Sequence, residues 1–169
     1  MKNMKKILIL VVLFFGFAAS SFAQSTDNAT ASATIIAPIS IAKTADMNFG
    51  NIAVNASPGT VILATDGSRT KTGGVTLPIV VGTVTAAHFL VTGAISTTYA
   101  ITLPTSITIS HSTDYMYVDT FISDPSSTGT IGNPSGTQVI WVGATLNVGA
   151  SQAAGVYGPG SFPVTVNYN

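Results

Sequence analysis

Hydrophobic and polar residues alternate with a period of two in short runs along most of this chain. The clearest run is the last one, in which one face of a predicted strand carries Phe162, Val164, Val166 and Tyr168. Comparable runs occupy residues 60–65, 75–82, 86–93, 97–103, 114–122 and 139–148. Gly, Pro, Asn and Asp residues separate the runs. The pattern predicts an all-β protein, most simply an antiparallel, immunoglobulin-like β-sandwich.

Two stretches add detail to this prediction. In the run 139–148, the even-numbered apolar residues share one face, and Trp141 lies on the opposite face. The longest stretch without alternation is 123–136, whose Ser, Pro and Gly content predicts a mobile loop. Because no internal repeat or linker follows residue 23, we expect one β domain.

The first 23 residues have the pattern of a secretory signal peptide. Three lysines precede the apolar run ILILVVLFFGFAA, and small residues precede a predicted cleavage site before Gln24. No second apolar run is long enough to span a membrane. The sequence therefore predicts a signal peptide (1–23), an N-terminal extension (24–36) and a β-sandwich domain (37–169). The protein is expected to be secreted, passing through the periplasm to the cell surface or the medium.

Charge is sparse in the predicted mature chain. Cleavage after residue 23 leaves three cationic side chains against six aspartates, a formal charge near −3, and there is no Cys. So few cations cannot neutralise a phosphate backbone, which argues against nucleic acid as a partner. Since charge normally keeps monomers soluble, this composition favours a protein that associates with copies of itself.

No arrangement of residues in the sequence indicates catalysis or metal binding. The aspartates lie in or beside predicted turns, where their local hydrogen bonds favour them. The two histidines, His88 and His111, are far apart and are predicted to be exposed strand or turn residues. No nucleophile-elbow motif accompanies them, and no cysteine or glutamate is present to complete a zinc site. We therefore expect a protein that is not an enzyme and binds no cofactor or metal.

Three segments together resemble a known family. ATIIAPISIAKTADMNFGNI, GVTLPIVVGTVTAAHFLVTG and VGATLNVGASQAAGVYGPGSFPVTVNYN resemble the bacterial secreted domain of unknown function 4402 over residues 29–169. DMNFG, and the GVY that leads into VTVNY, are similar to spore coat protein U domains and to pilins of archaic chaperone–usher systems. The GPG at 158–160 departs from these relatives and is expected to loosen or bulge the entry to the last strand.

The resemblance to pilins implies a pilus (fimbrial) subunit assembled by donor-strand complementation, with a periplasmic chaperone and an outer-membrane usher as partners. In such pilins a strand from the next subunit fills a groove beside the terminal strand. The donor face would consist of Ala29, Ala31, Ala33 and Ile35. The acceptor edge would be the terminal run that carries Phe162, Val164, Val166 and Tyr168.

Two alternatives remain open. Residues 29–41 could instead form the domain's own first strand, broken at Pro38. The protein could also be a self-complete binding module for glycans, using Trp141, Tyr115 and Tyr117 as a ligand or contact surface. A subunit contact is the favoured interpretation of Trp141, because much of the predicted surface is apolar or uncharged.

Overall fold

A computed structural model of the chain describes residues 24–169, which form antiparallel β-strands and no helix. The all-β, antiparallel prediction is confirmed. The strands are β1 (Ser40–Ala45), β2 (Asn48–Phe49), β3 (Ala53–Leu63), β4 (Arg69–Thr76), β5 (Val84–Thr85), β6 (Ala87–Thr92), β7 (Thr98–Thr102), β8 (Ser106–His111), β9 (Asp114–Asp124), β10 (Thr128–Thr130), β11 (Thr137–Val148) and β12 (Thr165–Tyr168).

The N-terminal residues before β1 contain no strand. The predicted signal peptide, residues 1–23, lies outside the described residues. Residues 24–34 group as a unit separate from the rest, and they have no regular secondary structure and exposed side chains. At the start of the second unit, Ile35 is 96% exposed and Ile36 is 51% exposed. Residues 29–39 therefore form no strand in this structure, and the first strand begins at Ser40.

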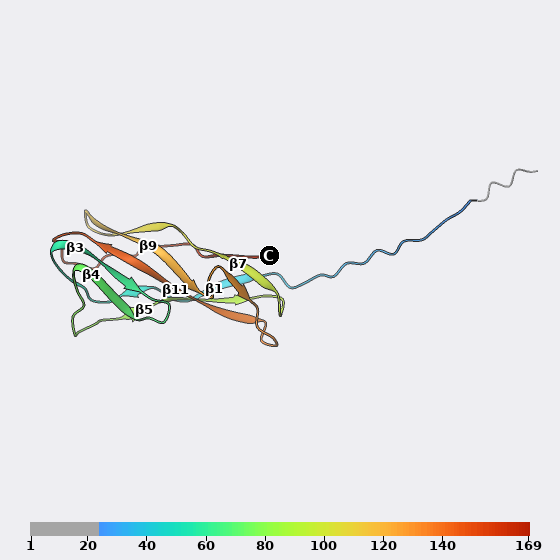
Figure 1. The fold of residues 1–169 in the computed structure, drawn as a ribbon, viewed down its shortest axis with the longest axis horizontal. Helices are drawn as coiled ribbons and strands as arrows, with labels where there is room; N and C mark the ends of the chain where they lie inside the picture. Colours follow the sequence, from blue (N-terminus) through green and yellow to red (C-terminus); the bar gives the residue numbers. More distant parts are fainter. Residues whose placement is uncertain (1–23) are drawn as a thin grey trace, which may run out of the picture. The chain divides into compact units, whose positions relative to one another are not determined.

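A curled, seven-stranded sheet contains most of the strand residues (Figure 1). Its strands follow the order β1-β6-β11-β3-β4, and β9 and β8 continue it from β11. The first half of β11 pairs with β6 and the second half with β3, while β9 pairs along the opposite edge over Trp141–Asn147. The twelve residues of β11 thus align three other strands.

Two smaller sheets complete the domain. β7 lies between β10 and β12, and β2 pairs with β5. In β12, Thr165–Tyr168 pair with residues 99–102 of β7. The terminal strand is thus shorter than the predicted run from 162, although its inward residues alternate as predicted.

Alternating side chains of β11 supply two hydrophobic clusters. One contains Ile140 and Val142 of β11, together with buried residues of β6, β7 and β12. The other contains Ala144, Leu146 and Val148 of β11, together with buried residues of β3, β4 and β9. All five of these β11 residues are buried, which confirms the predicted apolar face of the run 139–148. No charged or polar residue among the described ones is buried.

Two predicted segments differ from the structure. The run 75–82 is a strand only as far as Thr76, where β4 ends, and Ile79 is fully exposed. Pro78 accounts for this end, because it cannot donate a hydrogen bond to a neighbouring strand. The predicted loop 123–136 contains β10, and its Ile131 is 1% exposed, since β10 pairs with β7 there.

We expect the shared core of β11 to dominate stability. Ile140→Ala removes a side chain with no exposed surface, so it should lower the free energy of unfolding by about 2–5 kcal/mol. Ile122→Ala is the matched control, because Ile122 on the neighbouring β9 is 45% exposed and should cost under about 1 kcal/mol. Urea unfolding measures both, and equal losses would contradict this assignment of the core.

Candidate functional site

An open cleft of about 730 Å³ lies between two segments of the described chain. One wall is the segment 46–54, which contains β2, and the other is the segment 152–160. The floor comes from β8, β9 and β11. The cleft therefore lies where the second hydrophobic cluster meets two segments that contribute little strand pairing.

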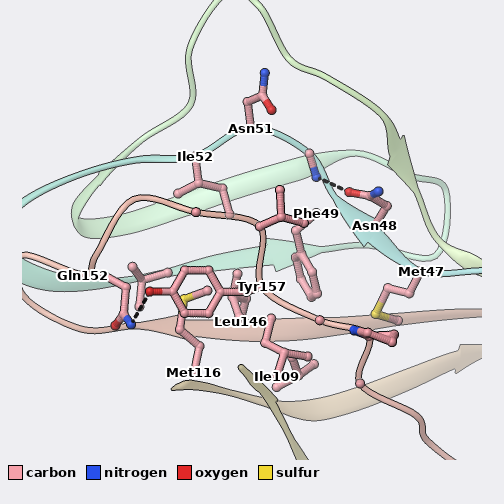
Figure 2. A pocket seen from close by; sticks show the side chains of 18 of the residues that line it. Met47, Asn48, Phe49, Asn51, Ile52, Ile109, Met116, Leu146, Gln152 and Tyr157 are labelled. Atoms are coloured by element: carbon pink, nitrogen blue, oxygen red, sulfur yellow. Dashed lines mark hydrogen bonds between the residues drawn. The ribbon is translucent and has the colours of Figure 1, made fainter. Parts of the chain in front are cut away.

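The side chains that line the cleft are mostly apolar (Figure 2). Met116 and Leu146 in the floor are buried, at 8% and 2% exposed. Phe49 and Ile52 reach into the cleft from one wall and Tyr157 from the other, and all three are partly exposed. Ile109 of β8 is also partly exposed in the lining. An extended apolar chain in the cleft would cover these partly exposed groups, which favours its binding.

Hydrogen bonds hold the wall 46–54 from the side away from the cleft. The Arg69 guanidinium donates to the backbone oxygens of Phe49 and Asn51. The backbone amide of Asn51 donates to the Val81 oxygen (2.8 Å). The Asn51 side chain points away from the cleft (Figure 2). Gly50 has a φ of 68° and packs against the backbone oxygen of Val81, with which a Cβ at this position would clash. The wall is thus fixed from behind.

The wall 152–160 is held by local bonds. The Gln152 side-chain amide donates to the Tyr157 hydroxyl (2.9 Å), which in turn donates to the Ala153 oxygen (2.9 Å). The Gly158 amide donates to the Ser110 oxygen of β8 (3.0 Å). Gly155 packs against the His111 ring, and a Cβ at this position would overlap the imidazole. These contacts fix the path of the segment without placing it in a sheet.

The backbone of this second wall leaves most of its donors unused. Within the described chain, Gly158 is the one residue between 153 and 162 whose backbone amide donates a hydrogen bond. Polar backbone groups beside an apolar surface are normally paired, and an added strand is one way to pair them. The segment thus has backbone amides without a partner in the described chain, beside a cleft lined by apolar side chains.

The predicted acceptor residues lie beside this cleft and beyond it. Phe162 lines the cleft and also contacts the first hydrophobic cluster. Val164, Val166 and Tyr168 belong to that first cluster. The Tyr168 hydroxyl accepts a hydrogen bond from the Ala94 amide (2.7 Å) and donates one to the Ala37 oxygen (2.9 Å). The predicted donor residues Ala29, Ala31, Ala33 and Ile35 are exposed.

The structure does not bring the predicted aromatic surface residues together. Trp141 pairs with Asp124 and Tyr117 with Asn147, so the two aromatics lie about 20 Å apart along the sheet. Trp141 instead packs against His88 of β6, with ring centroids 3.6 Å apart. Tyr115 and Tyr117 form a separate pair, with centroids 5.4 Å apart.

The titratable groups of the described chain form no cluster of the kind that binds a metal. No three His, Cys, Asp or Glu residues among residues 24–169 come together. Both histidines are partly buried, contrary to the predicted exposure, because His88 packs on Trp141 and His111 on Tyr157. Asp66 lies in a turn, where the Ser68 hydroxyl and amide hold the pKa of its carboxyl below the usual value. Residues 24–169 include no helix that would cross a membrane.

Sequence reasoning placed the acceptor site at the terminal strand and missed the two walls of the cleft. A signal was present: Met47 and Phe49 alternate in DMNFG, and both line the cleft. The segment 152–160 carried no such signal, because Gly and Ala dominate it and its contacts come from residues distant in sequence.

Comparison with known proteins identifies the family. The family described as Domain of unknown function (DUF4402) matches residues 39–168. No curated protein and no solved structure matches the chain. The matched span begins one residue before β1 and ends at the last residue of β12, so it covers every strand described above. The chain therefore belongs to the DUF4402 family.

Proposed function

We propose that this protein is a non-enzymatic structural subunit of a surface filament, assembled by strand addition. The observation that carries the proposal is the apolar cleft beside a segment, 153–162, in which Gly158 alone has a backbone amide that donates a hydrogen bond within the described chain. An extended segment laid along this wall would gain backbone hydrogen bonds and bury its apolar face on Ile109 and Phe49.

The finer description of the fold belongs to the same proposal. We infer an incomplete, pilin-like immunoglobulin sandwich in which the added strand completes the second hydrophobic cluster. The resemblance of DMNFG and GVY to spore coat protein U and archaic pilins supports this, since both motifs lie in the cleft walls. Such a subunit would be exported by its signal peptide, carried by a periplasmic chaperone and usher, and displayed on the cell surface.

The donor in this proposal is the segment 24–36 of another copy. In the described chain these residues form no strand, and their side chains are exposed, as a segment free to bind elsewhere requires. Thirteen extended residues reach about 43 Å, more than the nine residues of the wall 46–54 would need. Ile39 and Ile41 pack on the domain's own first cluster, so the donor contribution stops short of them.

The magnitude of the apolar contribution predicts a weak donor. Three Ala methyl groups at about 0.8 kcal/mol each and one Ile at about 1.5–3 kcal/mol give roughly 4–5 kcal/mol. Lost rotational and translational freedom alone costs about 4 kcal/mol or more. The net affinity must therefore come from the backbone hydrogen bonds and from Ile36, and we expect it in the micromolar to millimolar range.

Deleting residues 24–36 from the mature chain should abolish filaments and leave a folded, secreted monomer. The reason is that the deletion removes the donor and keeps all twelve strands. Electron microscopy of material sheared from cells measures the filaments, and circular dichroism measures folding. Filaments of normal length from the deletion variant would contradict assembly through this segment.

A substitution in the cleft tests the acceptor side. Ile109→Glu places a charge among the apolar side chains of the cleft. In the domain that lacks residues 24–36, this substitution should weaken the binding of a labelled 24–36 peptide at least about tenfold relative to the same domain without it. Fluorescence anisotropy measures this affinity.

Thr108→Glu is the matched control, because Thr108 is exposed on the opposite face of the same strand and should leave peptide binding unchanged. Equal affinity for Ile109→Glu and the unsubstituted domain would rule out the cleft as the acceptor.

A further inference from the structure

We propose that the outer face of the curled sheet carries a binding site for an uncharged oligosaccharide, centred on Tyr115 and Tyr117. This site is distinct from strand addition, because it uses the outward side chains of β9, β11, β3 and β4, although Met116, Val148 and Gln152 border both this hollow and the cleft. A shallow hollow of about 590 Å³ marks it, bordered on one side by residues 58–60 within β3 and 72–73 within β4, and on the other by the two tyrosines.

Strand register aligns polar side chains across this face. Tyr117 of β9 pairs with Asn147 of β11, which pairs with Thr60 of β3, which pairs with Thr72 of β4. Thr108 of β8 extends the row beyond Tyr117. The row therefore crosses five adjacent strands and presents a tyrosine, an amide and three hydroxyl groups at one level of the sheet.

The two tyrosines offer ring faces as well as hydroxyls. Tyr115 is 56% exposed and Tyr117 is 49% exposed, and the rings meet edge to face at 73°. A ligand that stacks on exposed aromatic rings buries their apolar faces, which favours binding. The C–H faces of a pyranose ring have the right shape and polarity to stack on such a ring.

Hydrogen-bonding groups surround the rings. The Thr60 and Thr72 hydroxyls lie 2.8 Å apart, so one of them accepts from the other and keeps its remaining lone pair for a ligand. The Asn147 side-chain amide donates to a carboxylate oxygen of Asp119 (2.9 Å), and this contact fixes the orientation of the amide. Sugar hydroxyls both donate and accept, which matches this mixture of groups.

No charged side chain of the described chain lines the hollow, which favours an uncharged ligand over a charged one. None of Lys43, Arg69 and Lys71, the cations among residues 24–169, lines the hollow. A sulfated, sialylated or phosphorylated glycan would find no counter-charge, whereas a neutral one loses nothing. A proline-rich peptide could also stack on tyrosines, but the hydroxyls and amides around them favour a ligand rich in hydroxyl groups.

A one-residue bulge separates this site from Trp141. The register of β9 against β11 shifts between Gly143 and Thr145, and Thr120 in the shifted part of β9 has a φ of 49°. Trp141 lies beyond the shift, packed on His88. Trp141 is therefore a control residue: it is exposed and aromatic like the tyrosines, and it lies outside the proposed site.

The test is isothermal titration calorimetry, in which the mature protein is titrated with uncharged hexasaccharides of glucose, mannose and N-acetylglucosamine. We expect at least one of them to bind, and Tyr117→Ala to weaken that binding about tenfold or more. Trp141→Ala should leave it unchanged. Circular dichroism must show that both variants are folded, which is expected because both side chains are exposed.

Three results would overturn the proposal: no binding of any of these sugars, equal loss in Tyr117→Ala and Trp141→Ala, or binding of a proline-rich peptide with no binding of sugar. Filament formation by Tyr117→Ala should match that of the parent protein. Loss of sugar binding and loss of assembly are therefore separate outcomes.

Discussion

The hydrogen-bonded ladders of β11 hold the main sheet together, and its inward side chains link that sheet to the rest of the core. This strand pairs with β6 and β3 along one edge and with β9 along the other. Its inward residues contribute to both hydrophobic clusters, so the same alternation that satisfies its backbone also fills the core. Every other element is positioned relative to this strand, including the floor of the cleft and the row of polar residues on the outer face.

The cleft exists because the second hydrophobic cluster extends beyond the strands that are paired in the main sheet. Leu146 and Val148 extend the apolar face of β11 beneath the segments 46–52 and 152–160, which cover that face without joining the main sheet. Segment 152–160 belongs to no sheet, and most of its backbone amides have no partner within the described chain. Under our proposal a partner strand pairs with these amides.

Much of the fold could be predicted from local pattern, and the site much less so. Alternation located β11 and its buried face, because both depend on a period of two within one segment. It failed at 77–82, where apolar residues follow Pro78 into an exposed loop, and at β10, whose three residues become a strand only by pairing with β7. The wall 152–160 depends on contacts with Ser110 and His111, which no local pattern in that segment could reveal.

Amide hydrogen exchange of residues 153–162 measures the central claim most directly. The 24–36 peptide should be added to the domain that lacks this segment, and exchange should be followed residue by residue. Our account predicts that amides of this wall gain protection as the peptide saturates, because they then donate to its backbone. Saturating peptide with unchanged exchange along 153–162 would contradict it.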